Sequence, residues 1–267
     1  MLKRVLSAIG FAGTTAACII ATEISAVIVI ALLSGLCAYE FYAMLRSDAK
    51  LPNEIVGTIA AALYPVAFFF LKINGMLLLT TVFALVVLIW YVFYVPARIT
   101  DVAITLFGAL YTGFMLTSFV VLRGTAPGIW GGLLAFVVVG SVWLNDALAF
   151  AIGSKFGKHK MAPRISPKKS WEGFAAGMVG SVLCWCLVPL IPGVELSWIW
   201  AIIIGIICGW VGILGDLLES RIKRATGHKD SGTLLPGHGG FLDRCDSMLL
   251  VGPTAFLLLH IAGLIPL

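Results

Sequence analysis

The charged stretch from Asp216 to Asp246 holds the residues best suited to chemistry. Five carboxylates and five Lys or Arg residues fall within its 31 positions, although only 12% of the chain is charged. The stretch lies between two hydrophobic runs, where ionisable groups are costly and usually functional. We therefore expect it to form part of a site at the edge of a membrane.

The carboxylates of this stretch are spaced so that they can act together. One helical face carries two carboxylates, a hydroxyl and an ammonium, from Asp216, Glu219, Ser220 and Lys223. Asp243 and Asp246 are three residues apart and would project together from the first turn of the next helix. Converging carboxylates need a cation between them. Oxygen ligands without a nearby cysteine pair favour Mg²⁺ or Mn²⁺ over zinc.

A glycine-rich segment precedes that second helix. Residues Pro236–Gly240 include three glycines, which would let backbone N–H groups approach an anion closely, although such segments also occur as plain turns. Within it, His238 could carry a proton or donate a hydrogen bond to phosphate. A purely structural histidine remains the alternative.

A second polar constellation lies upstream. Asp146 sits inside an apolar run about two turns from a basic loop, which favours a residue lining a site over a helix–helix anchor. The loop reads Ser166-Pro-Lys168-Lys169-Ser170-Trp-Glu. Ser170 is a plausible helix N-cap, and the two lysines would lie beside that helix N-terminus, a natural place for phosphate. The alternative is a loop that binds anionic lipid headgroups.

The elements that must position these residues are membrane helices. The 267-residue chain is 60% hydrophobic, and its apolar runs are continuous rather than alternating. This composition predicts an all-α, polytopic membrane protein. We expect about nine transmembrane helices, at about 6–21, 24–45, 54–71, 75–95, 101–122, 127–152, 171–191, 197–218 and 246–265.

Domain organisation and orientation follow from these spans. We expect N-terminal transmembrane helices in residues 1–125 and a catalytic region in 126–267, with cytosolic loops at 153–170 and 219–245. With the N-terminus inside, 16 of the 18 Lys and Arg residues face the cytosol, which leaves Lys72 and Arg123 outside. The net charge of +5 comes without a basic arm carrying aromatics, so we expect no nucleic-acid partner.

These features suit nucleotidyl or phosphoryl transfer onto a lipid, and a specific family resemblance strengthens that interpretation. The chain carries Ser220-x-Ile-Lys223-Arg224-x4-Lys229-Asp230-Ser-Gly-x2-Leu-Pro-Gly-His238-Gly239-Gly240-Phe-x-Asp243-Arg244-Cys-Asp246. This pattern resembles the signature of the phosphatidate cytidylyltransferase (CDP-diacylglycerol synthase) family. The resemblance is dense over about residues 140–252 and looser before them.

The resemblance implies an activity, cofactors and partners. CTP and phosphatidic acid would give CDP-diacylglycerol and pyrophosphate with Mg²⁺, and a potassium ion could share the metal site. It also implies a homodimer in the bacterial inner (plasma) membrane, with the active site facing the cytosol.

Roles for the candidate residues follow from that reaction. Asp216, Asp243 and Asp246 would hold the metal. Charge developing on the phosphates would be spread by Lys223, Arg224, Lys229 and Arg244. Substrate binding would fall to Asp146, Ser166, Lys168, Lys169, Ser220, Lys229, Asp230, His238, Gly239 and Gly240. Whether the two loop lysines contact the nucleotide or the lipid phosphate is left open.

Three other functions compete with this prediction. A CTP-dependent polyprenol or phytol kinase would share the membrane frame but transfer a γ-phosphate. An ion or phosphate transporter would use Asp146 and Asp216 as a pathway, but its charges should lie near the midplane rather than on one face. A lipid-binding scaffold would leave the paired carboxylates unexplained.

Overall fold

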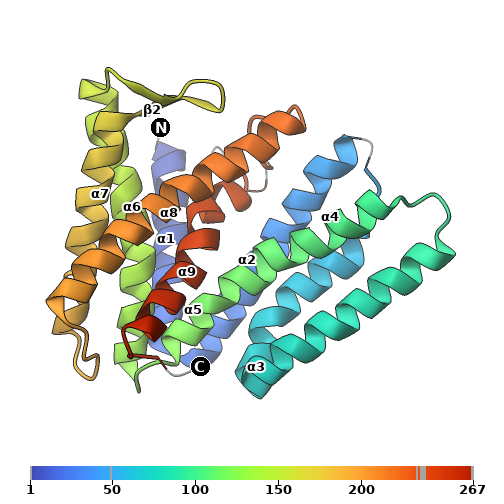
Figure 1. The fold of residues 1–267 in the computed structure, drawn as a ribbon, viewed down its shortest axis with the longest axis horizontal. Helices are drawn as coiled ribbons and strands as arrows, with labels where there is room; N and C mark the ends of the chain where they lie inside the picture. The colour runs from blue at the N-terminus through green and yellow to red at the C-terminus, as the bar shows by residue number, and fades with distance from the viewer. Residues whose placement is uncertain (1, 49, 233, 235–238, 266–267) are drawn as a thin grey trace. The chain divides into compact units, whose positions relative to one another are not determined.

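The computed structural model describes residues 2–48, 50–232, 234 and 239–265, and these residues are overwhelmingly helical (Figure 1). The helices are α1 (Leu2–Ala21), α2 (Glu23–Ser47), α3 (Glu54–Phe93), α4 (Ile99–Ala109), η1 (Leu110–Phe114), α5 (Met115–Arg123), α6 (Ile129–Phe156), α7 (Trp171–Trp185), η2 (Val188–Leu190), α8 (Trp198–Ala225) and α9 (Leu242–Ile261). Two short strands, β1 (Lys160–Ala162) and β2 (Ser166–Ser170), pair antiparallel.

Seven helical segments of the described chain are long and apolar enough to cross a membrane. The all-α, polytopic prediction is therefore confirmed, and the protein is an integral membrane protein. The count differs from about nine for two reasons. The described side chains of α1 begin at Gly10, which leaves a shorter apolar helix, and α3 is a single 40-residue element that contains two predicted spans.

The two halves of α3 form a hairpin. The backbone leaves the helical region at Lys72, with φ 52° and ψ −139°, and Figure 1 shows α3 folding back on itself. The Tyr64 hydroxyl and Thr80 Oγ1 lie 2.9 Å apart and join the two halves. A side chain at Gly75 would collide with the backbone of Ala67, so glycine is required where the chain reverses. The turn thus falls between the two spans expected at 54–71 and 75–95.

The chain divides into two compact units that are interleaved along the sequence. Unit 1 contains the residues up to Cys18, Glu23–Val121 and Lys223–Cys245. Unit 2 contains Ile19–Thr22, Leu122–Ile222 and the residues from Asp246 onward. The predicted division at 125/126 remains a prediction. The charged stretch of the sequence contributes residues to both units.

Unit 1 is built around Tyr42 of α2. This side chain is fully buried, and its hydroxyl donates to the carbonyl of Thr105 at 2.6 Å. Gly57 of α3 and Gly108 of α4 lie so close to the Tyr42 ring that an added Cβ would overlap it. The phenol therefore fills the space that two glycines leave between the helices, while its polar end keeps a hydrogen bond.

Unit 2 is built on close contact between α6, α7 and α8. Figure 1 shows α6 and α7 side by side, and Gly173, Gly177 and Gly180 lie on the face of α7 that meets α6. Small residues allow helices to pack at backbone distance in a membrane, where van der Waals contact replaces the hydrophobic drive. Asn145 of α6 is buried, and its Nδ2 donates to the carbonyl of Gly209 on α8 at 3.1 Å. Asn145 is thus a helix–helix anchor.

Candidate active site

The basic loop between α6 and α7 is an ordered β-ribbon. Its turn closes with a hydrogen bond from Ile165 N to the carbonyl of Ala162 at 3.2 Å, immediately before β2 begins at Ser166. Ser170 then caps α7, because its hydroxyl accepts from the N–H of Gly173 at 3.2 Å. The prediction of an N-cap at Ser170 is confirmed. The cap and the ribbon together fix the direction of the two loop lysines.

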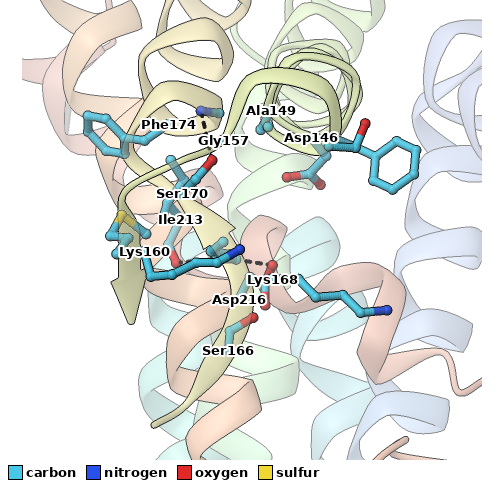
Figure 2. A pocket seen from close by; sticks show the side chains of 16 residues that line it. Asp146, Ala149, Gly157, Lys160, Ser166, Lys168, Ser170, Phe174, Ile213 and Asp216 are labelled. Atoms are coloured by element: carbon cyan, nitrogen blue, oxygen red, sulfur yellow. Dashed lines mark hydrogen bonds and ion pairs between the residues drawn. The ribbon is translucent and has the colours of Figure 1, made fainter. Parts of the chain in front are cut away.

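A cavity of about 490 Å³ opens between this ribbon and the helices of unit 2. Its polar lining includes Asp146 of α6, Asp216 of α8, and Ser166, Lys168 and Lys169 of β2. Figure 2 shows Asp146 and Asp216 facing the same space, while Lys168 extends away from Asp216 and is exposed. Asp216, from the charged stretch, and the upstream group of Asp146 and the β2 residues therefore line one cavity.

The cavity is also lined by apolar side chains, those of Ala149, Phe150, Met161, Phe174 and Ile213. A ligand that fills this space would meet both ionic groups and hydrocarbon. Such a lining suits an amphipathic molecule better than a fully polar one.

Asp216 is the best-connected polar residue of the cavity. Its Oδ2 lies 2.7 Å from Lys169 Nζ, and its Oδ1 accepts from the Ser220 hydroxyl at 3.2 Å. Lys169 Nζ also lies 3.5 Å from the carbonyl of Ile213, one turn earlier on α8. Lys169 and Asp216 remain partly exposed, at 21% and 31% of their side chains, so a ligand in the cavity can reach both.

Four carboxylates interact electrostatically in unit 2, with Asp246 of α9 at the centre. Its partners are Asp146, Asp216 and Glu219. Asp216 and Glu219 of α8 come near Asp246 because α8 and α9 pack at backbone distance, whereas Asp146 belongs to α6. A Cβ at Gly215 would lie 2.6 Å from the carbonyl oxygen of Asp246, so only glycine permits this approach. Like charges at such proximity repel, and a cation among them would relieve the repulsion.

This donor set fits a hard divalent cation in an open site. In the part of the chain that the structure describes, no three His, Cys, Asp or Glu side chains already form a metal cage. Mg²⁺ is commonly bound by one or two carboxylates together with substrate phosphates, so it does not need a complete protein cage. Asp216 and Asp246 offer those carboxylate oxygens, whereas a zinc site would normally be closed by Cys and His.

A second group of predicted residues is assembled in unit 1 around Asp243. Its Oδ1 lies 2.6 Å from Lys223 Nζ, and its Oδ2 accepts from the N–H groups of Ser231 at 3.0 Å and Gly240 at 2.8 Å. A Cβ at Gly239, where φ is +81°, would lie 2.6 Å from the same Oδ2. Asp243 therefore gathers both ends of the loop between α8 and α9. Its predicted role as a metal ligand remains a prediction.

The remaining candidates of the loop lie at its surface. The exposed ones are Arg224, Lys229, Asp230 and Arg244. The Arg224 guanidinium donates to the carbonyl of His228 at 3.3 Å, which steadies the start of the loop. His238 lies outside the described residues. The structure thus groups the candidates into a cavity set in unit 2 and a loop set in unit 1.

Four polar residues that organise these groups were given no site role from the sequence. Glu219 is fully buried and interacts electrostatically with Asp246, and the sequence had placed it only on one helical face with Asp216. Asn145, the neighbour of Asp146, was not assigned to the site. Ser231 and Glu40 are buried and hydrogen-bonded to each other. They are far apart in the sequence, so no local pattern could join them.

Comparisons with known proteins identify the family of the chain. A model of the Cytidylyltransferase family matches residues 2–262. The phosphatidate cytidylyltransferase of Bacillus subtilis strain 168 is 36% identical over 179 residues, which cover 66% of this chain and 66% of that protein. The Staphylococcus saprophyticus protein of the same name is 43% identical over 164 residues, 60% of this chain and 59% of the relative.

A third relative has the same name. The phosphatidate cytidylyltransferase of Mycobacterium tuberculosis strain H37Rv is 40% identical over 139 residues, 49% of this chain and 42% of the relative. Each of these matches spans less than two thirds of the relative's own length. The family model, by contrast, extends over nearly the whole chain. The chain belongs to the Cytidylyltransferase family.

Proposed function

We propose that this protein transfers the cytidylyl group of CTP to phosphatidic acid, giving CDP-diacylglycerol and pyrophosphate. The observation that carries the proposal is the cavity of unit 2, which is lined by Lys169, Asp146, Asp216 and apolar side chains, and whose two carboxylates interact electrostatically with Asp246. Membership of the Cytidylyltransferase family and the names of the bacterial relatives support the same activity.

Asp216 and Asp246 would hold the Mg²⁺ ion, with Asp243 as a further predicted ligand. Mg²⁺ bound there supplies positive charge to the phosphates of CTP and lowers the barrier to displacement. Lys169 lies beside this position and would bind a phosphate oxygen that approaches Asp216. Lys223, Arg224, Lys229 and Arg244 would spread the charge that develops on the leaving pyrophosphate.

The reaction itself is an in-line displacement. A phosphate oxygen of phosphatidic acid forms a new bond to the α-phosphorus of CTP, and the bond from that phosphorus to the bridging oxygen of pyrophosphate breaks. The attacking oxygen is already ionised, so no strong general base is required. The protein's contribution is to position two anions against each other and to offset their charge.

The apolar side chains of the cavity suit the lipid substrate. Phe150 and Phe174 would contact the glycerol backbone and the first acyl carbons, while Ser166 and Lys168 would bind phosphate groups. The acyl chains would remain in the bilayer. The bacterial relatives support a plasma-membrane location, and we propose that CTP reaches the site from the cytosol. We also propose that the protein works as a homodimer.

The test is product analysis with purified protein in detergent. We expect CDP-diacylglycerol and pyrophosphate from CTP and phosphatidic acid with Mg²⁺, and no product when EDTA replaces it. Formation of CDP and a phosphorylated lipid from a polyprenol or phytol acceptor would instead identify a kinase. Ion or phosphate flux across proteoliposomes, without any nucleotide chemistry, would identify a transporter.

A further inference from the structure

Glu40 of α2 is a buried carboxylate that the proposed reaction does not use. Only 2% of the residue is exposed, and it lies on a transmembrane helix outside the densely matched part of the sequence. A single glutamate near the end of an apolar run can face either the protein interior or the membrane surface. The structure places it in the interior of unit 1, against the loop that follows α8.

One oxygen of Glu40 binds both ends of this loop. Oε2 accepts from the Ser231 hydroxyl at 3.0 Å and from the N–H of Leu242 at 2.9 Å. The Leu242 N–H is one of the donors that the first turn of a helix cannot satisfy internally. A carboxylate is favoured at that place because the N-terminus of a helix carries partial positive charge. Glu40 therefore caps α9 from a distant part of the chain.

Two glycines lie directly against the Glu40 carboxylate. An added Cβ at Gly232 would lie 2.5 Å from Oε1, and one at Gly240 would overlap both Oε2 and the Ser231 hydroxyl. The Ser231 hydroxyl in turn accepts from the backbone N–H of Asp243 at 3.3 Å, so the contact continues to the backbone of a predicted catalytic residue. Hydrogen bonds and close contacts to the Glu40 side chain thus hold the loop and the start of α9.

We propose that Glu40 is a positioning residue, which holds residues 230–232 and 239–241 of the loop and the first turn of α9 in the arrangement that turnover requires. The inference rests on the proposed function for its link to turnover. The part of the proposal that concerns the ordering of the loop does not depend on the proposed function. The hydrogen-bonding oxygen matters more than the charge, because both donors share Oε2.

Four variants test this proposal in the full-length protein. Glu40→Gln can present its amide oxygen to both donors, so its kcat should stay within about threefold of the parent. Glu40→Leu keeps a similar volume but has no acceptor, so its kcat should fall by roughly 30-fold or more. Ser231→Ala should lower kcat by a smaller factor, and it remains informative where Glu40→Leu fails to fold. Glu23→Gln, an exposed glutamate at the start of α2, is the matched control and should leave kcat unchanged.

A thiol probe reports on the loop without reference to activity. Cys245, in the first turn of α9, is fully buried, and Cys208 of α8 is 1% exposed. We expect N-ethylmaleimide, followed by peptide mass spectrometry, to label Cys245 roughly tenfold faster in Glu40→Leu than in the parent, while Cys208 stays protected. Glu40→Gln should protect Cys245 as the parent does.

Each outcome supports or overturns the proposal. The proposal is supported if Glu40→Leu loses kcat and its Cys245 is labelled faster, while Glu40→Gln keeps the kcat and the labelling rate of the parent. Parental kcat or parental labelling in a folded Glu40→Leu overturns it, as does a Ser231→Ala protein that matches the parent in both measurements. A parent protein that forms no CDP-diacylglycerol overturns the proposed function, and the labelling of Cys245 then still decides whether Glu40 orders the loop.

Discussion

Replacing Lys223 with methionine should open the loop between α8 and α9. The Lys223 ammonium lies 2.6 Å from Asp243 Oδ1, and the two side chains are only 12% and 11% exposed. Removing one partner of a buried ion pair typically costs about 3–5 kcal/mol, because the other charge is left uncompensated. Asp243 keeps two backbone N–H donors in this variant, so we expect a cost of about 3 kcal/mol.

A loss of about 3 kcal/mol in the stability of the closed loop raises the population of molecules with an open loop roughly 150-fold. Hydrogen–deuterium exchange of a peptide that begins at Leu242 measures it, because the N–H groups of Arg244 and Cys245 bond to the carbonyl of Phe241 in the closed loop. We expect these amides to exchange roughly 150-fold faster in Lys223→Met, and CDP-diacylglycerol synthesis to fall to background.

A double variant separates stability from activity. Lys223→Met combined with Asp243→Asn removes both charges, so exchange should return to within about tenfold of the parent, while activity stays lost. Arg221→Met, at an exposed position of the same helix, is the matched control and should change neither. The reasoning is refuted by parental exchange in Lys223→Met, or by a double variant that exchanges as fast as the single one.

Three further predictions concern unit 2. Asp246→Asn should lower Mg²⁺-dependent turnover more than 100-fold in rate assays, because the amide keeps the shape of the carboxylate but loses its charge. The melting temperature should stay within a few degrees of the parent. Retained turnover would remove Asp246 from the proposed metal ligands. Gly215→Ala should destabilise by about 1–3 kcal/mol in thermal unfolding, since its Cβ would meet the backbone of α9, whereas Gly13→Ala, with open space around it, should not. Ser170→Ala should cost about 1 kcal/mol through loss of the α7 cap, and an unchanged melting temperature would contradict that.

The membrane helices and the cap at Ser170 could be predicted because their causes are local. A transmembrane helix satisfies its own backbone hydrogen bonds, so the length of an apolar run is enough to find it. An N-cap needs a hydroxyl that accepts a hydrogen bond from the backbone N–H three residues later, and this spacing can be read directly from the sequence. The same holds for Asp216 and Ser220, whose helical spacing anticipated their hydrogen bond.

The assembly of the loop could not be predicted, because its contacts are not local. Glu40 and Leu242 are 202 positions apart, and a single glutamate near the end of an apolar run is compatible with either the interior or the membrane surface. The cavity lining was expected only in part for the same reason. Asp146 and Lys169 were identified as candidates, but the ion pair between Lys169 and Asp216 depends on how the ribbon lies over α8.

The glycine-lined contact between α6 and α7 has a consequence for how such a protein can diverge. The positions of Gly173, Gly177 and Gly180 face backbone atoms or buried side chains of α6, so almost any larger residue would push the two helices apart. Val179 and Leu183, on the same helix, are 56% and 57% exposed, and a membrane accepts most apolar side chains there. Substitutions that leave the fold intact would therefore accumulate mainly on the outward face of α7. The shape of the cavity would then depend partly on Gly177 and Gly180, which do not line it.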